Sequence, residues 1–435
     1  MLQVLLIFLL IAAAVFGTEA EPLSGALQQA LPQLGQQGSC KELPQFGVGI
    51  HPRRNPDDIN VGLVSDVGAR MVRFDISWME VERQNHYNFG SYDHLISKLR
   101  ESGRSIVLLL DYGHPDHSDG TGENGLPLPP RTPEQRAAYS KFVQAVAARY
   151  NGPDIAYEIW NEPNIAWFWA PEPDSTAYGK LLSEAVSAIR EVEPAATIIS
   201  GGLANMNDPP EFLHELAQAG TLDRLDGIAL HPYRQDEPEN SLYDITKFKN
   251  AVAEPLPIWI TEWGYSESWL AKLDTSHVQQ RLAVMTARLM LTAALAKAKA
   301  ALVYELIDDG TDSKDQESNF GLYDYDLKPK LAATAFRTVA EIISACSTYE
   351  FRLDKTIDVV TATFHFDDFV SYIVWTYAAG RPREICFAAD ARRTQLQDVT
   401  GNRIAVQTCA DSRVELQVSE SAGPLILQTK NSLFQ

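Results

Sequence analysis

Short apolar runs alternate with polar loops and amphipathic stretches along most of the chain. Eight of the runs predict buried strands, at residues 46–50, 71–76, 105–111, 155–160, 197–200, 227–230, 258–261 and 300–306. Their near-continuous apolar character is typical of parallel strands that are covered on both faces. The stretches between them predict helices, most clearly after Thr132, which is followed by Pro133 and then Gln135 in the pattern of a capping box.

Eight strand–helix alternations in about 300 residues predict an α/β fold of the (β/α)8 TIM-barrel type. A doubly wound open sheet is the structural alternative. However, the first unit does not open with the Gly-rich fingerprint that a dinucleotide-binding sheet would need.

After Cys346 the pattern changes to short, alternating, β-branched runs at residues 361–366, 370–377, 383–388 and 414–418, which predict antiparallel strands. We therefore divide the chain into a signal peptide (1–20), a leader segment (21–44), a catalytic barrel (45–346) and a β-sandwich-like accessory domain (347–435). The last domain contains a single tryptophan, Trp375, within a predicted strand. This favours a brace on the barrel over a sugar-binding module with an exposed aromatic platform.

Residues 1–17 form an apolar run, and the small residues Thr18 and Ala20 follow it. This pattern predicts a signal peptide cleaved after Ala20, and so an exported protein that is periplasmic or extracellular and has no membrane attachment after cleavage. The run has no Lys or Arg before it, so an uncleaved N-terminal anchor is the alternative.

Export makes disulfides possible, and the chain has four cysteines. Cys40 precedes the first predicted barrel strand and Cys346 ends the last barrel helix. These two points are neighbours at the bottom of a barrel, so we expect the pairs Cys40–Cys346 and Cys386–Cys409. Four free thiols are the alternative.

Candidate chemistry lies at the carboxyl ends of the predicted strands, where barrel enzymes carry their active sites. Glu162 follows the fourth strand and Glu262 ends the seventh. Either glutamate alone could cap a helix or bind a loop arginine. Two carboxylates on opposite sides of one barrel mouth are what the hydrolysis of a glycosidic bond requires.

The sequence Asn161-Glu162-Pro163 after strand four, with Glu262 ending strand seven, resembles the clan A retaining glycoside hydrolases across residues 45–345. Within that clan it resembles glycoside hydrolase family 39 and the glycosidases of exopolysaccharide gene clusters. The resemblance implies that Glu162 is the general acid/base, that Glu262 is the nucleophile and that Asn161 binds the sugar 2-hydroxyl.

Three further residues match the same clan. Arg73 in strand two would keep Glu262 ionised, and His231 and Tyr233 at the end of strand six resemble the clan's His-x-Tyr, with the tyrosine donating to Glu262. The alternatives are an ion pair at the core edge for Arg73, and ordinary packing for His231 and Tyr233. Glu158 is expected to pair with a basic group inside the barrel.

Tryptophans cluster in the loops beside the two glutamates, at Trp167, Trp169, Trp263 and Trp269. Sugar rings stack on aromatic planes, so we expect Trp167, Trp169 and Trp263 to bind substrate. Packing within a lid is the alternative. Many clan members carry a tryptophan at the end of strand eight, and here Tyr304 is expected to take that place; a differently shaped sugar subsite is the alternative.

The formal net charge of −20 argues against nucleic acid and anionic membranes as partners. We expect neither a cofactor nor a metal, because His114 and His117 have no apparent third ligand. The sequence therefore predicts a retaining glycosidase that cleaves β-linked bonds in a poly- or oligosaccharide, with the aromatic loops favouring internal (endo) cleavage. A transglycosylase on the same site and a non-catalytic carbohydrate-binding component of a polysaccharide assembly system are the alternatives.

Overall fold

The structure is a computed structural model that describes residues 36–52, 55–84, 86–204, 210–272, 276–377, 382–419 and 423–430. Eight parallel strands form one sheet in the order β8-β7-β6-β3-β2-β11-β10-β9. They are β2 (Gln45–Gly49), β3 (Met71–Ser77), β6 (Ser105–Asp111), β7 (Ile155–Asn161), β8 (Thr197–Gly202), β9 (Ile228–Leu230), β10 (Ile258–Trp263) and β11 (Ala300–Val303). Bridges between Ile199 and Gly227 and between Leu203 and Leu230 join the two outermost strands. The sheet closes, and the predicted barrel is confirmed.

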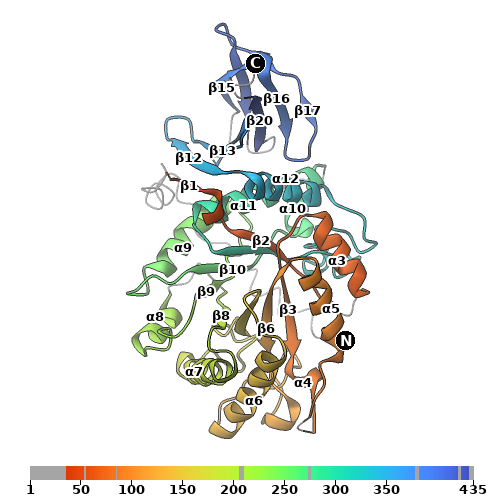
Figure 1. The fold of residues 1–435 in the computed structure, drawn as a ribbon, viewed down its shortest axis with the longest axis vertical. Helices are drawn as coiled ribbons and strands as arrows, with labels where there is room; N and C mark the ends of the chain where they lie inside the picture. The colour runs from red at the N-terminus through yellow and green to blue at the C-terminus, as the bar shows by residue number, and fades with distance from the viewer. Residues whose placement is uncertain are drawn as a thin grey trace.

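One main helix follows each barrel strand and covers the outside of the barrel (Figure 1). The eight are α3 (Asp57–Asp66), α5 (Gly90–Glu101), α6 (Pro133–Arg149), α7 (Ser175–Val192), α8 (Glu211–Gln218), α9 (Ser241–Lys249), α11 (Val278–Leu295) and α12 (Leu331–Ala345). The predicted capping box is present, because Thr132 accepts from the Gln135 backbone and Gln135 returns a bond to the Thr132 backbone.

Shorter elements occupy the loops. They are η2 (Cys40–Glu42), α4 (Trp78–Val81), β4 (Glu82–Arg83), β5 (His86–Tyr87), η3 (Pro115–His117), η4 (Pro238–Asn240), α10 (Glu267–Ala271), η5 (Glu317–Asn319) and η6 (Ala391–Arg393).

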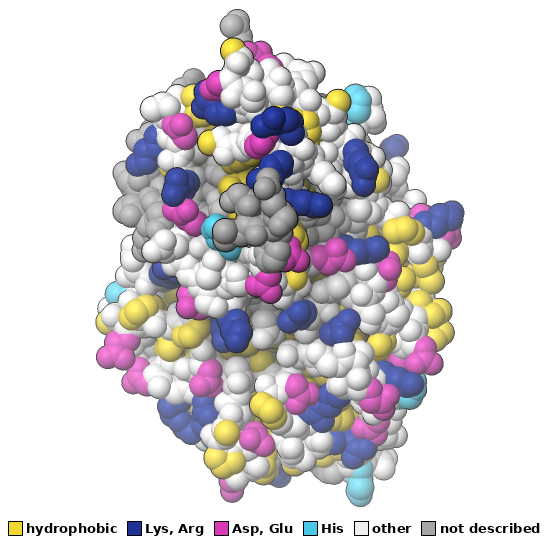
Figure 2. Space-filling model, turned by 45° about the horizontal axis from the view of Figure 1, so that its top comes forward, with side chains coloured by type: hydrophobic (Ala, Val, Ile, Leu, Met, Phe, Trp, Pro, Cys, Tyr) yellow, Lys and Arg dark blue, Asp and Glu magenta, His cyan; other side chains and the backbone are white. Residues whose placement is uncertain are grey.

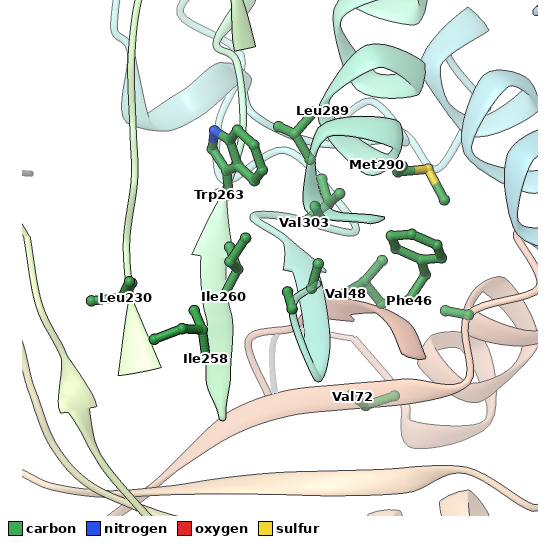
Figure 3. Close-up of a cluster of buried hydrophobic side chains, with 14 of the residues drawn as sticks. Phe46, Val48, Val72, Leu230, Ile258, Ile260, Trp263, Leu289, Met290 and Val303 are labelled. Atoms are coloured by element: carbon green, nitrogen blue, oxygen red, sulfur yellow. The ribbon is translucent and has the colours of Figure 1, made fainter. Parts of the chain in front are cut away.

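The barrel strands bury apolar side chains on both faces. The inner layer consists of Met71, Val107, Ala156, Ile199, Ala229, Trp259, Ala300 and Leu302. On the outer face, Ile258 and Ile260 of β10 belong to one apolar cluster with Leu230, Val303 and Leu289 of α11, and Ile258 points toward Leu230 (Figure 3). The apolar inner layer leaves the carboxyl ends of the strands as the place for polar side chains.

The C-terminal residues form an antiparallel β domain beside α11 and α12 (Figure 1). A seven-stranded sheet has the order β1-β12-β13-β14-β20-β16-β17, and a three-stranded sheet has the order β15-β19-β18. The strands are β12 (Thr348–Asp354), β13 (Val359–His365), β14 (Phe369–Thr376), β15 (Arg383–Asp390), β16 (Thr394–Asp398), β17 (Arg403–Ile404), β18 (Gln407–Thr408), β19 (Arg413–Val418) and β20 (Leu425–Lys430). Apolar residues of both sheets pack into one small core.

The first strand of the larger sheet comes from the other end of the chain. Strand β1 (Gln37–Ser39) lies in the segment read from sequence as a leader and pairs antiparallel with β12. The backbone just before the barrel is thereby held against the backbone just after it.

Both expected disulfides are present. Cys40 bonds to Cys346 and Cys386 to Cys409, with Cα–Cα distances of 5.9 and 6.0 Å. The first closes a loop with a sequence separation of 306 residues, between the start of the barrel and the end of α12. The predicted signal peptide lies outside the described residues. Within the described residues, none of the helices combines the length and apolar character that a membrane span requires.

The surface carries mixed charge. On the face drawn in Figure 2, acidic and basic side chains lie interspersed over both the barrel and the β domain. The net charge of −20 is therefore not displayed as one acidic patch on this face.

Candidate active site

The end of β7 places Glu162 at the barrel mouth through an unusual backbone. Trp160 and Glu162 adopt positive φ angles of 72° and 43°, a left-handed region that costs non-glycine residues of the order of 1 kcal/mol. Tertiary contacts hold this turn, since the Trp160 indole donates to the Phe168 carbonyl at 3.0 Å. Glu162 is 8% exposed at the point where the chain leaves the strand.

Strand β10 presents Glu262 by a break in its register. The pairing with β11 shifts between Ile260 and Trp263. As a result Thr261 faces the barrel interior, Glu262 reaches the mouth and Trp263 faces the helical layer near Leu289 (Figure 3). Glu262 retains a side-chain exposure of 16%.

Arg73 connects the predicted site residues Asn161 and Glu262 with the buried Glu158 from the barrel interior. Its guanidinium donates to Glu158 at 2.8 and 3.2 Å, to Glu262 Oε2 at 2.9 Å and to Asn161 Oδ1 at 3.0 Å. Glu158 is fully buried and also accepts from the Gly202 backbone at 2.9 Å. The planar guanidinium suits several fixed acceptors at once, and the expected partner of Glu158 is Arg73.

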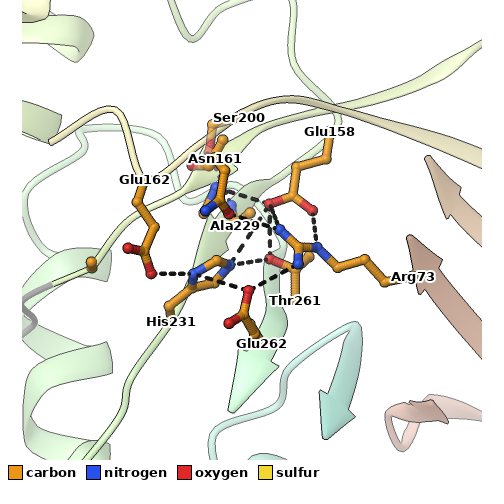
Figure 4. Close-up of polar contacts among 12 residues, drawn as sticks. Arg73, Glu158, Asn161, Glu162, Ser200, Ala229, His231, Thr261 and Glu262 are labelled. Atoms are coloured by element: carbon orange, nitrogen blue, oxygen red, sulfur yellow. Dashed lines mark hydrogen bonds and ion pairs between the residues drawn. The ribbon is translucent and has the colours of Figure 1, made fainter. Parts of the chain in front are cut away.

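The two glutamates converge on His231. Its Nδ1 lies 2.7 Å from Glu162 Oε1 and 3.7 Å from Glu262 Oε2 (Figure 4). The two carboxylate oxygens are therefore no further apart than the sum of these distances. One oxygen of each carboxylate thus lies beside the same imidazole nitrogen, and a retaining glycosidase, with carboxyl groups roughly 5–5.5 Å apart, needs such a close approach.

A chain of hydrogen bonds fixes which nitrogen of His231 carries a proton. The Thr261 hydroxyl donates its only proton to Glu158 Oε1 at 3.0 Å, so its oxygen must accept from His231 Nε2 at 3.1 Å. In neutral His231 the other nitrogen, Nδ1, is then an acceptor. Nδ1 faces Glu162, so a neutral imidazole accepts from a protonated Glu162. Burial acts to lower the pKa of His231, but the charge of Glu262 and the hydrogen bond and charge of Glu162 raise it, and a protonated His231 donates from Nδ1 to an ionised Glu162.

The two glutamates have opposite pKa shifts. Burial raises the pKa of Glu162, the charge of Glu262 adds to this, and the hydrogen bond and charge of His231 only partly offset it. Burial also acts to raise the pKa of Glu262, but the charges of His231 and Arg73 and the Tyr233 hydrogen bond outweigh it, so that this pKa is lowered. Near neutral pH, Glu262 is the carboxylate and Glu162 is the better proton donor.

Tyr233 and Asn161 complete the polar set. The Tyr233 hydroxyl donates to Glu262 Oε1 at 2.9 Å, and burial together with the charge of Glu262 holds its pKa well above the usual range, so the hydroxyl keeps its proton. Arg73 occupies the carbonyl oxygen of Asn161, which leaves the amide nitrogen as the donor of this side chain. The structure thus brings together Arg73, Asn161, Glu162, His231, Tyr233 and Glu262.

The aromatic residues divide into two groups. Trp169 and Trp263 are fully buried, and both belong to the main core. The expectation that they stack on sugar is not supported, because neither ring has an open face. Trp167 is only partly buried. Tyr304 follows β11, is also partly buried, and has its ring centroid 6.5 Å from that of Tyr233.

A second polar cluster at the mouth was not predicted from the sequence. His51 Nε2 lies 3.1 Å from Glu305 Oε2 and 3.6 Å from Asp309 Oδ2, and the three ligand-type atoms lie within 4.8 Å of one another. Burial acts to lower the pKa of His51, but the hydrogen bond and charge of Glu305 raise it to about 9. The raised pKa favours an ion pair between a protonated His51 and these carboxylates near neutral pH.

Sequence reasoning missed the part that Thr261 plays. The only signal was position, since Thr261 directly precedes Glu262, and a threonine that ends an apolar strand is unremarkable. His51 carried a similar signal, because it follows the first strand directly.

The chain is similar to known glycoside hydrolases in both sequence and structure. The model of the family "Cellulase (glycosyl hydrolase family 5)" matches residues 51–297. A β-xylosidase of Caldicellulosiruptor saccharolyticus is 26% identical over 211 residues, which are 42% of this chain and 41% of that protein. The chain thus spans about two-fifths of the curated relative that it matches.

Solved structures support the fold. A family 39 glycoside hydrolase from Bacteroides cellulosilyticus WH2 aligns with a TM-score of 0.73 and 22% identity, over 90% of this chain and 82% of that one. A GH39 β-xylosidase from Caulobacter crescentus aligns with a TM-score of 0.67 and 17% identity, over 92% of this chain and 98% of that one. At these identities the likeness concerns the fold of the barrel and the β domain.

Proposed function

The chain belongs to the cellulase family (glycosyl hydrolase family 5) of clan A glycoside hydrolases, and on that premise we propose that it hydrolyses β-linked glycosidic bonds with retention of anomeric configuration. Glu162 acts as general acid/base and Glu262 as nucleophile. The observation that carries the proposal is the approach of both carboxylates to one nitrogen of His231 combined with their opposite pKa shifts.

The proposed reaction has two displacements. In the first, Glu262 attacks the anomeric carbon while Glu162 gives its proton to the departing glycosidic oxygen. In the second, Glu162 takes a proton from water, the water oxygen attacks the same carbon, and Glu262 leaves as a carboxylate. Arg73 and Tyr233 stabilise Glu262 as an anion before attack and after release. Asn161 donates from its amide to the 2-hydroxyl.

We propose a poly- or oligosaccharide with β-linkages as substrate. The matching curated relative and one of the solved structures are named β-xylosidases, so β-xylosides are the first compounds to test. Internal cleavage remains our proposal. It relies on Trp167 and Tyr304, which are only partly buried, since Trp169 and Trp263 are fully buried.

We also propose that the protein is exported. The two disulfides support this, as does the apolar N-terminal run. N-terminal sequencing of the secreted protein is expected to begin at Glu21. A secreted product that begins at Met1 would contradict cleavage.

A screen of aryl β-glycosides and β-linked polysaccharides tests the function directly, with the Glu262→Gln variant as control. Proton NMR of the first sugar released is expected to show the β-anomer before mutarotation. Loss of viscosity ahead of reducing-sugar release indicates internal cleavage. Release of the α-anomer, or equal turnover by wild type and Glu262→Gln, would contradict the proposal.

A further inference from the structure

One side chain of the C-terminal β domain, Trp375, hydrogen-bonds to a buried charged residue of the barrel. Trp375 lies on β14 and is fully buried. Strand alternation directs Ile373 and Trp375 to the main core, while Val374 joins the small core between the two β sheets. The Trp375 indole Nε1 donates to Glu239 Oε1 at 2.8 Å.

Glu239 belongs to a buried group of charges that involves α11. Arg288 of this helix is 1% exposed and donates to Glu239 at 3.0 and 2.6 Å. It also pairs with Glu237, which is 8% exposed. One guanidinium thus faces two carboxylates, and the indole N–H of Trp375 adds a further donor for the excess negative charge. Buried charges need such complete hydrogen bonding to be tolerated.

Glu237 and Glu239 end the same stretch of chain that begins with His231 and Tyr233, here called the 231–240 segment. It runs from the carboxyl end of β9 to η4. Its middle is tied down by Arg234, which donates to Asp236 at 2.6 and 2.8 Å and to Asp244 at 2.5 Å. The Tyr265 hydroxyl, three residues after Glu262, donates to the Asp236 carbonyl at 2.5 Å.

The 231–240 segment therefore has a catalytic end and an anchored end. At the catalytic end, Tyr233 donates to Glu262 and His231 contacts Glu162. At the anchored end, Trp375 of the β domain donates to Glu239. The 231–240 segment is short and held by its own hydrogen bonds, so a displacement of Glu239 would also displace Tyr233. The 2.9 Å hydrogen bond from the Tyr233 hydroxyl to Glu262 would then lengthen or lose its alignment.

We propose that Trp375 is a positioning residue for the catalytic centre: through Glu239 it fixes the segment that holds Tyr233 against Glu262. The β domain is then a working part of the barrel's site, beyond a passive cover on α11 and α12. The inference rests on the proposed function for the role of Glu262, while the contacts themselves do not.

The test measures the pKa of Glu262 by NMR of the full-length chain carrying ¹³C-labelled glutamate carboxyls, with the signal assigned by its loss in Glu262→Gln. Tyr233→Phe removes a hydrogen bond that lowers this pKa, so the pKa is expected to rise. Trp375→Phe is expected to raise it in the same direction by a smaller amount. The double variant should match Tyr233→Phe alone, because both changes act through one hydroxyl.

Tyr377→Phe is the matched control. Its hydroxyl donates to Asp358 within the β domain at 3.1 Å, so its removal is expected to leave the pKa of Glu262 unchanged. The titratable groups that interact with Glu262 stay the same in Trp375→Phe and in the control. They are His51, Arg73, Tyr112, Glu162, His231, Tyr233, Tyr304 and Glu317. If Trp375→Phe does not fold, Glu239→Gln keeps the side-chain shape, tests the same anchor and carries the same expectation.

Two outcomes would overturn the inference. The first is a Trp375→Phe variant with a lowered Tm but an unaltered Glu262 pKa, which would make Trp375 structural only. The second is a pKa shift that adds to that of Tyr233→Phe. Because the NMR titration requires no turnover, an inactive wild-type chain would count against the proposed function without deciding the role of Trp375. In an active chain, the acid limb of kcat/KM is expected to move with the pKa of Glu262.

Discussion

The ends of β7 and β10 each place one glutamate at the same barrel mouth, yet the two side chains have opposite acid–base character. Both are extensively buried, and burial acts to raise the pKa of both. Glu262 has a fixed cation in Arg73 and a hydroxyl donor in Tyr233. Glu162 hydrogen-bonds to His231, and the charge of Arg73 acts on it more weakly, without a direct contact. The opposite pKa shifts of the two glutamates therefore come from the partners that each side chain meets across the barrel, more than from the depth of burial.

This contrast also gives the sign of the pH dependence. Activity is expected to rise with pH as Glu262 ionises, below the ordinary carboxyl range because its pKa is lowered. It should fall when pH passes the pKa of Glu162, which is raised. The kcat/KM profile is therefore expected to be bell-shaped, with a wider interval between its acid and basic limbs than two unperturbed carboxyl groups would give.

The largest effect is expected from Glu262→Gln. The amide cannot attack the anomeric carbon, so kcat should fall by about 10⁴-fold or more, while near-ultraviolet circular dichroism and Tm stay close to wild type. Glu134→Gln, at the exposed start of α6, is the control and should keep full activity. Near-normal turnover by Glu262→Gln would remove it as nucleophile.

Glu162→Ala should produce a loss that depends on the leaving group. Glycosides with unactivated alcohols need protonation, and their kcat/KM should fall by about 10²–10⁴-fold. Aryl glycosides with acidic phenols should lose far less in kcat/KM, and azide should raise their turnover by capturing the intermediate as a β-glycosyl azide. Equal losses on both kinds of substrate, with no azide effect, would contradict the acid/base assignment.

Arg73→Met is expected to affect both stability and activity. Glu158 is fully buried, and a buried carboxylate without its cation costs about 3–5 kcal/mol in the free energy of unfolding, measured by urea denaturation. The pKa of Glu262 should rise as well, and the acid limb with it. The double variant Arg73→Met/Glu158→Leu should recover part of the free energy of unfolding. The acid limb of its kcat/KM profile should stay at the higher pH of Arg73→Met. Recovery of both would show that Arg73 acts on Glu158 alone.

The smallest effect is expected from Thr261→Val. This change removes the acceptor for His231 Nε2, so the imidazole can carry its proton on Nδ1 and donate to an ionised Glu162. The pKa of Glu162 should fall, and the basic limb of kcat/KM should move to lower pH by less than about one unit. A shift to higher pH would contradict the assigned direction of the hydrogen bonds.

Much of the barrel could be predicted from the sequence, because each strand is a local apolar run. The contrast between Glu162 and Glu262 could be anticipated only by resemblance. Its physical basis lies in contacts across the barrel, such as those of Arg73 with Glu262 and of Thr261 with His231, which no local pattern encodes. Trp263 is buried because the register of β10 shifts before it, and simple strand alternation does not predict such a shift.

The β domain shows the same limit. Its short strands were recognisable, and the positions of Cys40 and Cys346 at the barrel bottom were enough to pair them. The pairing of β1 with β12 and the bond from Trp375 to Glu239 join segments far apart in the sequence. They depend on how the domain docks against α11, which its own pattern does not specify.

The central claim is that Glu262 forms a covalent bond to sugar while Glu162 supplies the proton. The direct measurement is mass spectrometry of the protein after incubation with a 2-deoxy-2-fluoro-glycoside of the preferred sugar bearing a dinitrophenyl leaving group. We predict a mass increase of one fluoroglycosyl unit, located on the peptide that contains Glu262 and absent from Glu262→Gln. A label on any other residue, or an active enzyme that turns this compound over without ever carrying the label, would contradict the account.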